Sequence, residues 1–557
     1  MYSKIQQVRT VRQLGTVCTV NIHSGVEKVM TTELNLVDKW KSIPWCKLRK
    51  IVFRLQVRIF KAQKNGNTRL VRKLQKLLLS SKAAKLLAIR QVTQLNTGKK
   101  TAGVDGKKAL EIPQRLALYE LLIKDWKQWK HQPLKRVYIP KADGNKRGLG
   151  IPTISDRAYQ CFLKYALEPI AEAMFNEFSY GFRPGRSCHD IQKQLFFNLN
   201  NSKANGISKR ILELDIEQCF DKIDHKFLMQ SVQLPKAAKL GLFRAIKAGV
   251  RGEYFSSESG TPQGGTISPL LANIVLHGLE NVGHELRYKK LRGGKYIDTI
   301  KGFRYADDVV FILKLGDSPE LLRKHIDTFL ETRGLKVKEA KTKVVNSTEG
   351  FDFLGWNFIV KPNGKFISTP SQKSTRSIKT KVKEVMKDSR FTLEQRIAKC
   401  GDKVRGWRNY HRFCNMSQHD LWATAYWTWK FIRKQGRFDR NQTNKVIHRA
   451  FPSVKWSACR FVSVKGDKSP YDGDFVYWAK RENANYDGIT ARFLKKQNYH
   501  CTHCNLSFIS GDIAELHHID GNHENWKSSN LEVLHRECHQ HQTSHGRVGC
   551  DLDIIQE

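Results

Sequence analysis

The chain has 557 residues, with 97 Lys or Arg against 52 Asp or Glu, which gives a formal net charge of +45. That length accommodates about three or four domains, each with its own hydrophobic core. Cationic residues in excess along the whole chain are typical of a polyanion-binding protein, and nucleic acid is the leading candidate. No long uncharged apolar segment is present, and Arg9, Arg12 and Asn21 interrupt any apolar stretch near the N-terminus. We therefore expect a soluble intracellular protein without a membrane span or signal peptide.

Three helices are predicted in the first part of the chain. Apolar residues recur at helical spacing from Trp40 to Gln63 and from Leu70 to Leu78, with basic residues on the other faces. Ser155 is expected to cap a third helix, which runs beyond Pro169.

Two β-hairpins are predicted from short strand-forming runs separated by turn residues. Val137–Lys141 pairs with Arg147–Pro152, and Phe358–Val360 pairs with Phe366–Ile367. The dipeptide Asn363-Gly364 between the second pair is typical of a type I′ turn.

The middle of the chain alternates strands, a glycine-rich loop and helices. A strand over Arg210–Ile216 contains Asp215 at its end, and the loop Gly260–Pro269 opens an apolar helix over Leu270–Leu279. A further helix is predicted over Ser318–Arg333.

Two adjacent carboxylates, Asp307 and Asp308, stand between the strand-forming runs of Gly302–Leu313. Like charges at a hairpin tip repel each other, and a divalent cation such as Mg²⁺ relieves that repulsion. Taken alone, such a pair is more often a solvated turn. Asp215 alters that interpretation, because one pair of adjacent strands could bring all three carboxylates together. Two metal ions roughly 3.5–4 Å apart on such carboxylates catalyse nucleotidyl transfer without a side-chain nucleophile.

Most of the twelve cysteines are isolated in apolar or helical contexts, which favours a reducing compartment over a disulfide framework. Cys501 and Cys504 are the exception, because Cys-x-x-Cys is the spacing of a zinc knuckle. His535 and Cys538 offer a second pair at that spacing, so we predict a tetrahedral structural zinc site, although a Cys-x-x-Cys second pair is more usual. Other histidines of the region are competing ligands: His503, His523, His541 and His545.

Several motifs stand in the order found in one protein family. They are Leu214–His225, Gly260–Asn273, Phe303–Asp308, Gly334–Thr342 and Phe353–Gly355. The run Phe-Arg-Tyr-Ala-Asp-Asp resembles the catalytic box of reverse transcriptases, and the first of the motifs resembles their first aspartate motif. The order and spacing of the whole set resemble group II intron-encoded proteins, and this resemblance covers roughly residues 35–557.

The resemblance implies an α+β multidomain fold. A right-hand polymerase with fingers and palm would be followed by an α-helical thumb, or maturase domain X, and a zinc-containing ββα-metal HNH domain. The implied boundaries are an irregular extension (1–35), a basic helical extension of the fingers (36–100), fingers and palm (101–368), thumb/maturase domain (369–440), a basic linker or DNA-binding region (441–488) and an HNH endonuclease (489–557). We expect most tryptophans between Ser371 and Arg437 to pack inside the thumb, which leaves lysines and arginines to contact RNA.

The resemblance also assigns roles in the polymerase site. Asp215, Asp307 and the Ile216 carbonyl would hold two Mg²⁺ ions, with Asp308 in support. The other site residues would act on the substrate. Lys141 and Arg147 would bind the triphosphate, and Phe220 would stack under the sugar and exclude a 2′-hydroxyl. Gln263 and Gly264 would line the nucleotide pocket beside the template, and Lys341 would protonate the leaving pyrophosphate. Phosphate oxygens suit both the arginine fork and the lysine point charge. An ordinary core role stays open for Phe220, and a solvated one for Lys341.

The segment 515–539 contains a His-His-Ile-Asp run and an Asn-Leu run and resembles the HNH nuclease motif. His518 would be the general base, which suits an imidazole whose pKa lies near neutrality. His517 and His539 would bind one divalent metal, Mg²⁺ or Mn²⁺, and Asn530 would fix the loop through backbone hydrogen bonds. The alternative is a zinc-binding module without cleavage.

Together these motifs imply an RNA-directed DNA polymerase, splicing maturase and site-specific DNA endonuclease that acts in target-primed reverse transcription, or retrohoming. The implied partners are group II intron RNA in a ribonucleoprotein, target double-stranded DNA and dNTPs, with no membrane. The implied location is cytoplasmic, in a bacterial or organellar interior, and nucleoid-associated on DNA. Two alternatives stay open: a reverse transcriptase of another retroelement class, and an RNA-binding splicing cofactor with inactive enzyme sites.

Overall fold

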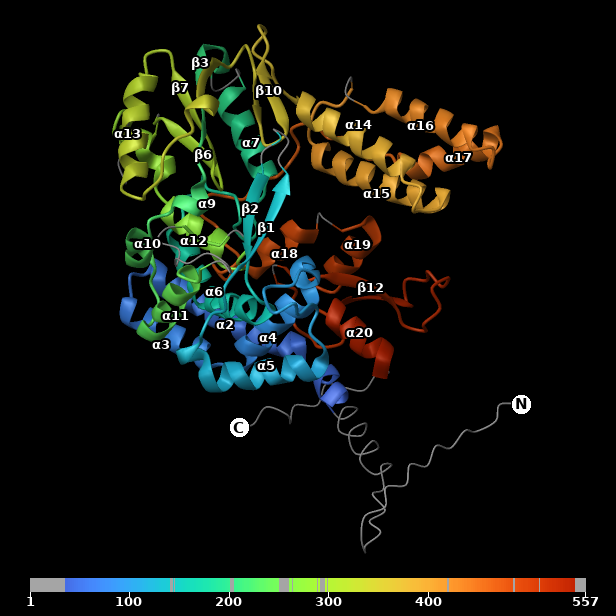
Figure 1. Ribbon diagram of the computed structural model, residues 1–557. Helices are drawn as coiled ribbons and strands as arrows, with labels where there is room; N and C mark the ends of the chain where they lie inside the picture. Colours follow the sequence, from blue (N-terminus) through green and yellow to red (C-terminus); the bar gives the residue numbers. More distant parts are fainter. Residues whose placement is uncertain are drawn as a thin grey trace, which may run out of the picture.

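The computed structural model is drawn in Figure 1. It describes residues 36–140, 144, 146–200, 205–249, 260–262, 264–287, 289–290, 296–297, 299–417, 420–483, 486–509 and 511–545. The predicted extension 1–35 lies outside these residues, as do the predicted nucleotide-binding residues Lys141 and Gln263.

A helical layer forms the lower part of the molecule in Figure 1. Its elements are α2 (Trp45–Lys64), α3 (Thr68–Ser80), α4 (Lys82–Arg90), the π-helical η1 (Gln91–Leu95), the short η2 (Thr97–Lys100), α5 (Ile112–Asp125), η3 (Trp126–Gln128) and α6 (Ile154–Met174). The two predicted N-terminal helices are confirmed as α2 and α3. The first predicted helix is interrupted: residues 36–41, which include Trp40, are helical, and α2 begins at Trp45. The break falls at Ile43, because the residue that precedes a proline, here Pro44, disfavours helical geometry.

The predicted cap of the third helix is wrong by two residues. Thr153, not Ser155, is the N-cap of α6, since its hydroxyl accepts the N–H of Asp156 at 3.1 Å. The helix continues through Pro169, as predicted.

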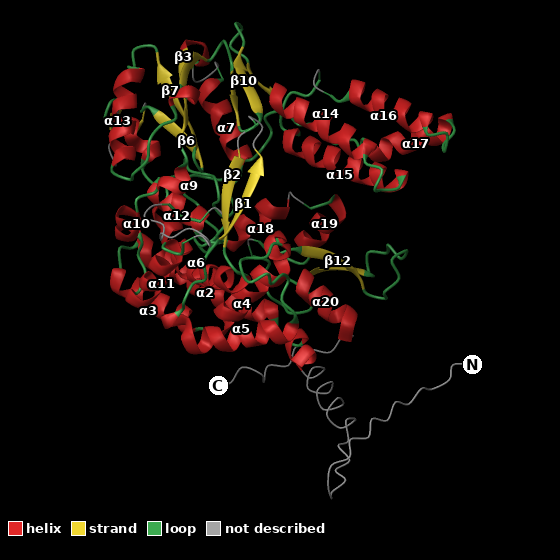
Figure 2. Cartoon of the chain, in the orientation of Figure 1, coloured by secondary structure: helices red, strands yellow, loops and turns green. Residues whose placement is uncertain are grey.

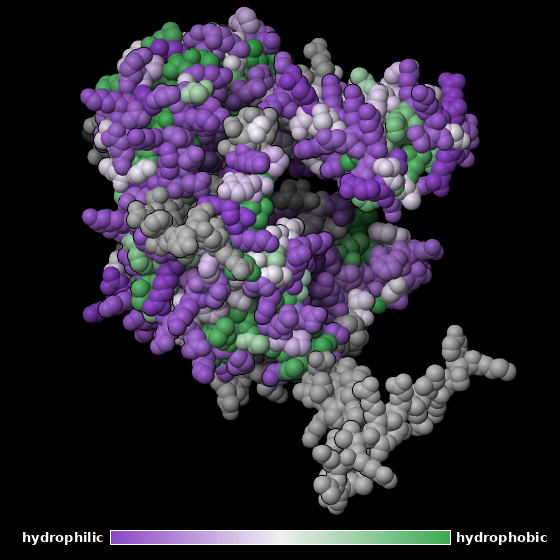
Figure 3. All heavy atoms as spheres, in the orientation of Figure 1, coloured by the Kyte–Doolittle hydropathy of each residue, from purple (hydrophilic) through white to green (hydrophobic). Residues whose placement is uncertain are grey.

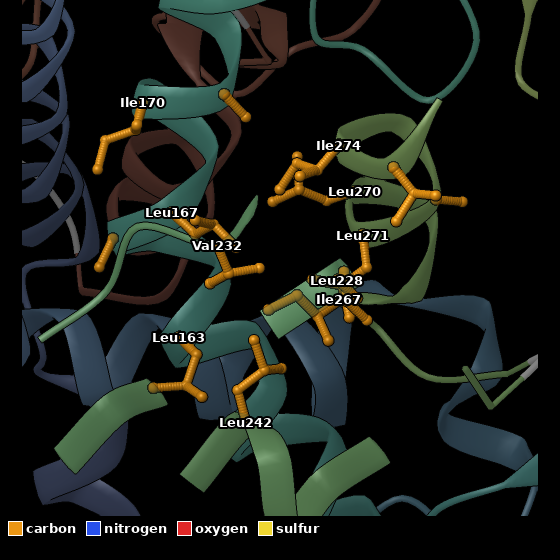
Figure 4. Close-up of a cluster of buried hydrophobic side chains, with 14 of the residues drawn as sticks. Leu163, Leu167, Ile170, Leu228, Val232, Leu242, Ile267, Leu270, Leu271 and Ile274 are labelled. Atoms are coloured by element: carbon orange, nitrogen blue, oxygen red, sulfur yellow. The ribbon is translucent and has the colours of Figure 1, made fainter. Parts of the chain in front are cut away.

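Aliphatic side chains join α6 to three helices of the middle segment, as Figure 4 shows. These helices are α10 (His225–Ser231), α11 (Lys236–Ile246) and α12 (Ser268–Val275). Leu163, Leu242 and Leu271 have no exposed surface in this core. The apolar helix expected over 270–279 is shorter than predicted, because the chain turns at Gly278 (φ +100°) into the 3₁₀ helix η5 (Leu279–His284).

A four-stranded antiparallel sheet lies above this layer, with strand order β6-β7-β3-β8. Its strands are β3 (Lys209–Asp215), β6 (Lys301–Tyr305), β7 (Asp308–Lys314) and β8 (Lys343–Asn346), flanked in Figure 2 by α7 (Cys188–Leu199) and α13 (Pro319–Glu331). Ile211 and Ile312 pack into the core that contains α7, whereas Leu212 and Phe311 pack into the core that contains α13. This alternation is the two-residue period of a sheet covered on both faces.

Smaller strands surround the sheet. They are β1 (Lys135–Pro140) with β2 (Lys146–Ile151), the short β4 (Lys289–Lys290) with β5 (Tyr296–Ile297), and the sheet of β9 (Phe351–Phe353), β10 (Trp356–Val360) and β11 (Phe366–Pro370). Both predicted hairpins are confirmed. The predicted type I′ turn is wrong, because Gly364 has positive φ but Asn363 does not. The N–H of Gly364 bonds to the carbonyl of Lys361 at 2.8 Å, which makes a type I turn followed by a left-handed glycine.

A helical bundle projects to one side in Figure 1. It contains α14 (Gln372–Lys387), α15 (Leu393–His411), α16 (Trp422–Lys434) and α17 (Arg440–Ala450). Because Ala450 and Phe451 lie in the same core as Ile378, the bundle extends past the predicted boundary at residue 440. The expectation that its tryptophans are mostly internal fails for Trp422, which is 77% exposed.

The C-terminal region folds back onto the helical layer. It contains α18 (Phe475–Asn483), α19 (Gly488–Lys496), the hairpin of β12 (Ala514–His518) and β13 (Leu531–His535), and α20 (Arg536–His545). The predicted linker 441–488 is anchored on α6, because the Tyr471 hydroxyl donates to Glu168 at 2.9 Å and the Ser469 hydroxyl to Glu172 at 3.3 Å.

Hydrophilic side chains dominate the face shown in Figure 3, which is hollowed between the helical bundle and the C-terminal region. A cavity of about 1250 Å³ lies near the end of α15 and α18, and its lining includes Arg412, Arg460 and Arg481. None of the described helices combines the length and the apolar character that a membrane crossing requires.

Candidate functional site

The three predicted acidic residues meet at one end of the central sheet. Asp215 ends β3 and Asp308 begins β7, and the two are direct cross-strand partners. Asp307 precedes Asp308 in the tight turn from β6, where Ala306 adopts a left-handed conformation (φ +58°). Cross-strand partners point to the same face of a sheet, so the strand pairing predicted from the sequence brings these carboxylates together.

The electrostatics of this turn oppose three ionised carboxylates. Burial, together with the charge of Asp215, raises the pKa of Asp307. Burial also raises the pKa of Asp308 to about 6, with further contributions from the charges of Asp307 and Asp215. Because the Asp308 side chain is exposed to solvent, we attribute its raised pKa more to the charges of Asp307 and Asp215 than to burial. A site of this kind gains most from a bound cation.

Basic residues supply part of that positive charge. Lys341 lies in the short helix η6 (Glu339–Lys341), and its Nζ is 2.7 Å from Oδ2 of Asp215. Arg147, opposite Ile139 in the β1–β2 hairpin, lowers the pKa of Asp307 by its charge. Both side chains therefore act electrostatically on the acidic turn.

Backbone pairing fixes the chain that follows Asp215. Ile216 forms an isolated antiparallel bridge with Val337. On either side of it, the carbonyl of Asp215 accepts the N–H of Lys338 at 2.8 Å, and Glu217 N–H donates to Lys336 at 2.9 Å. The Ile216 carbonyl, a predicted metal ligand, therefore belongs to a segment that backbone hydrogen bonds fix next to Asp215.

Two further predicted site residues, Phe220 and Gly264, are closely packed in the structure. Phe220, in the one-turn helix α9 (Cys219–Lys222), is 8% exposed, and its ring centroid is 6.4 Å from that of Phe182. It also belongs to the main core, so the structural role remains alongside the sugar-binding one. Gly264 has φ +138°, and a Cβ on it would lie 2.9 Å from the carbonyl oxygen of Gly150, so no side chain fits between this loop and β2.

Arg304 is the structural residue of this site that sequence reasoning missed. It is fully buried in β6, and its Nε is 2.5 Å from Oε1 of Glu280, which is also fully buried. Its other nitrogens donate to the side chains of Asn273 and Ser179 and to the carbonyl of Ala306 in the acidic turn, at 2.7–3.0 Å. Although burial alone would raise it, the guanidinium holds the pKa of Glu280 below its ordinary value. An arginine within an apolar strand was the only sequence signal of this role.

The C-terminal module places two predicted metal ligands side by side. His517 in β12 and His539 in α20 have ring centroids 5.0 Å apart. Nδ1 of His539 is 2.9 Å from Glu515, which also accepts from Arg536 at 2.6 Å. Burial opposes ionisation of Glu515, but these two bonds lower its pKa overall. The carboxylate thereby orients the His539 ring.

The predicted general base has a different environment. His518 is 6% exposed, and its ring lies 5.0 Å from that of His523 and 5.1 Å from that of Trp526. Its Nε2 is buried and has no hydrogen-bond partner among the residues that the structure describes. A buried imidazole nitrogen without a partner usually has a role outside the fold, such as binding water or a ligand.

Asn530 holds the loop between β12 and β13. Its carboxamide donates to Asp520 Oδ1 at 2.8 Å and to the carbonyl of Asn525 at 2.9 Å, and it accepts the N–H of Asp520 at 3.0 Å. These bonds are of the loop-fixing kind that the sequence resemblance implies.

The cysteine cluster differs from the predicted ligand set. Cys504, His535 and Cys538 converge, but the fourth member of the group is Cys46 from α2, and these ligand atoms all lie within 4.8 Å of one another. Cys501 is adjacent, where its Sγ accepts the N–H of His535 at 3.5 Å, and is not part of that group. The sequence prediction chose Cys501 because it forms a Cys-x-x-Cys pair with Cys504. Cys46 lies far away in the chain, and no such spacing points to it.

Comparison with known proteins identifies the larger part of the chain. Three family models match: the N-terminal domain of reverse transcriptase over residues 40–122, reverse transcriptase (RNA-dependent DNA polymerase) over 139–358, and the group II intron maturase-specific domain over 375–451. The chain is 30% identical over 482 residues to Maturase-like protein 1 of Euglena gracilis, which covers 86% of this chain and 99% of that protein. The chain belongs to the group II intron maturase/reverse transcriptase family.

Two further relatives support that assignment. The maturase is 33% identical over 324 residues to Protein YkfC of Escherichia coli, covering 52% of this chain and 84% of that one. It is 30% identical over 355 residues to Group II intron-encoded protein LtrA of Lactococcus lactis, covering 52% and 58%. The reverse transcriptase and maturase parts of the family resemblance drawn from the motifs are therefore confirmed. Reverse transcriptases of this kind generally use Mg²⁺. The matched models end at residue 451, before the C-terminal module.

The ion pair behind the acidic turn gives a stability prediction. Glu280→Gln removes the charge that compensates the buried guanidinium of Arg304, so we expect the free energy of unfolding in urea to fall by about 3–5 kcal/mol. The control is Glu285→Gln, whose side chain is 81% exposed, with an expected change within about 0.5 kcal/mol. Equal stability of the two variants would contradict the role given to the pair.

The raised pKa of Asp308 gives a pH prediction. A carboxyl that titrates near 6 in the folded maturase and near 3.8 when unfolded binds extra protons in the folded state, so its contribution makes stability fall as pH rises from about 4 to 6. We expect Asp308→Asn to flatten this part of the melting-temperature profile in magnesium-free buffer. Identical slopes for the variant and the wild-type protein would show that Asp308 titrates normally.

Proposed function

We propose that this maturase copies its intron RNA into a DNA site that it nicks itself, by target-primed reverse transcription. The C-terminal module would act as an HNH endonuclease and leave a DNA 3′-hydroxyl, and the reverse transcriptase domain would extend that end along the RNA. The two chemistries are complementary, since a polymerase of this type needs a primer end.

The observation that supports the nuclease most directly is the histidine arrangement on the β12–β13–α20 frame. His517 and His539 adjoin each other and would hold one divalent metal, Mg²⁺ or Mn²⁺. Nε2 of His518 is buried and has no hydrogen-bond partner among the described residues, so it would be available to accept a proton from water. Asn530 braces the loop that carries His523 and Trp526 beside His518.

In the polymerase site, Asp215, Asp307 and the Ile216 carbonyl would hold two Mg²⁺ ions, with Asp308 in support. Such ions supply the positive charge that activates a primer hydroxyl and stabilises departing pyrophosphate. Arg147 and Lys141 would bind the triphosphate of an incoming dNTP, and Lys341, which contacts Asp215, would protonate the leaving pyrophosphate. Phe220, Gln263 and Gly264 would shape the nucleotide pocket and the sugar preference.

The helical bundle and the neighbouring cavity fit a polyanion. Trp422 and Tyr426 are 77% and 59% exposed on α16, where Lys430 Nζ lies 4.6 Å from the Tyr426 ring centroid. Aromatic rings beside lysines can stack on unpaired bases while the cations contact phosphates. Intron RNA would bind this surface, and target double-stranded DNA would reach the C-terminal module, within a bacterial cell or an organelle.

Asp307→Ala tests the polymerase site. We expect cDNA synthesis on an RNA template to fall at least about a hundredfold, because the charge stabilisation of the transition state is lost. RNA binding and splicing assistance should persist, since the bundle is unchanged. Asp327→Ala on α13 is the control and should extend primers normally. Undiminished synthesis by Asp307→Ala would reject the site, and loss of splicing in that folded variant would contradict the separation.

His518→Ala tests the nuclease. We expect DNA nicking to disappear while extension from a pre-nicked template continues, because the base and the polymerase acids lie on different elements. His500→Ala, an exposed histidine of the same module, is the control. Nicking at the wild-type rate would exclude His518 as the base. Absence of nicking by the wild-type protein on its intron-insertion site would reject the endonuclease.

A further inference from the structure

A residue of the N-terminal helical layer reaches into the C-terminal module. Cys46, in the first turn of α2, lies with its Sγ 3.4 Å from Sγ of Cys538 in α20. Sγ of Cys504 is 3.4 Å from Nδ1 of His535. Together these residues form the group of ligand atoms that lie within 4.8 Å of one another. The four donors come from two parts of the chain that are separated by more than 400 residues.

The donor set has the chemistry of a structural zinc site. Three thiols and one imidazole prefer Zn²⁺ in tetrahedral geometry. The imidazole is oriented for ligation, because its other nitrogen, Nε2, is 3.3 Å from Oδ2 of Asp512. A carboxylate on the far ring nitrogen is the usual partner of a metal-bound histidine, and it leaves Nδ1 facing the sulfurs.

The neighbouring Cys501 is the competing fourth donor, because its side chain also contacts Cys504, His535 and Cys538. It has no exposed surface, and its Sγ accepts the backbone N–H of His535 at 3.5 Å. Such a bond stabilises the turn that carries a ligand without requiring ligation by the acceptor. Five donors for a four-coordinate ion mean that one is dispensable. The four whose ligand atoms all lie within 4.8 Å of one another include Cys46 and leave out Cys501.

Charged contacts around the cluster join the same two parts of the chain. Nη1 of Arg49 in α2 is 2.5 Å from Oδ1 of Asp512, the carboxylate whose other oxygen holds His535. Arg90 at the end of α4 is 3.3 Å from Glu537. Asp512 has a side chain only 5% exposed, so this pair belongs to a formed interface rather than to a chance surface contact.

An open cavity gives an ion access to the cluster. It has a volume of about 200 Å³, and Cys46, Cys504 and Cys538 are among its lining residues.

We propose that Cys46, Cys504, His535 and Cys538 bind one zinc ion that clamps the C-terminal module onto α2 of the reverse transcriptase. The metal is then a joint between two domains instead of a support internal to one. This inference is independent of the nuclease proposal, since the clamp holds the module in place whether or not the module cleaves DNA.

Cobalt substitution of the full-length protein tests the ligand identity. Tetrahedral Co²⁺ gives a thiolate charge-transfer absorption that grows with the number of sulfur ligands. We expect Cys46→Ser to lose roughly a third of this intensity, because three thiolates become two, and to release zinc to a competing chelator at least about tenfold faster. Cys501→Ser should keep the full intensity, and Cys459→Ser, a half-buried cysteine elsewhere, is the control.

The opposite pattern would overturn the proposal. If Cys501→Ser loses the intensity and Cys46→Ser retains it, the site is a knuckle internal to the module. Absence of bound zinc in the purified wild-type protein, or a disulfide between Cys46 and Cys538 in its place, would also overturn it.

Wild-type protein provides a second test that does not depend on a variant that folds. We expect alkylation of Cys46, mapped by mass spectrometry, to be slow with zinc bound and fast after chelation, whereas Cys459 should react equally in both states. Amide hydrogen exchange in the first turns of α2 should rise together with that of α20 when zinc is removed. Exchange that rises in α20 and not in α2, with Cys46 reacting equally in both states, would show that the metal does not reach the N-terminal layer.

Discussion

The guanidinium of Arg304 and the carboxylate of Glu280 are both fully buried directly behind the acidic turn. Two buried charges are tolerated only when they are paired and their remaining donors are satisfied. Arg304 meets that condition with bonds to Asn273, Ser179 and the Ala306 carbonyl. The same bonds join β6, the helix α12 and the loop before α7 to the turn that carries Asp307. The position of the reactive carboxylates therefore depends on a polar network that is itself excluded from water.

In the acidic turn itself, negative charges outnumber the positive charges that could compensate them. Asp215, Asp307 and Asp308 share one end of two paired strands, so each carboxylate raises the cost of ionising the next. Lys341 and Arg147 reduce that cost without removing it. In a chain with a net charge of +45, this is a local concentration of negative charge. The excess of basic residues suits nucleic-acid phosphates, and the acidic site suits divalent cations.

The C-terminal region shows how weakly patterned segments are held. Residues 441–488 lack regular periodicity, yet Tyr471 and Ser469 bond to buried acids of α6, and Arg186 donates to the carbonyls of Gly466 and Lys468. Individual side-chain bonds to a preformed surface take the place of a shared hydrophobic stripe. Such a segment appears as a linker in the sequence, because its partners lie far away in the chain.

The sequence by itself determined the family, through the order of its motifs along the chain. It also determined the two hairpins and the strand pairing that brings the three aspartates together, because hydrophobic periodicity and turn chemistry act over a few residues. The type of turn at Asn363-Gly364 was misjudged, because the loop length and Pro362 selected another geometry. Only the tertiary structure decided that Glu280 neutralises Arg304 and that Cys46 lies against Cys538, 492 residues away. A buried charge or a metal ligand takes its partner from whichever surface docks against it, and docking depends on the shape of whole domains rather than on local sequence.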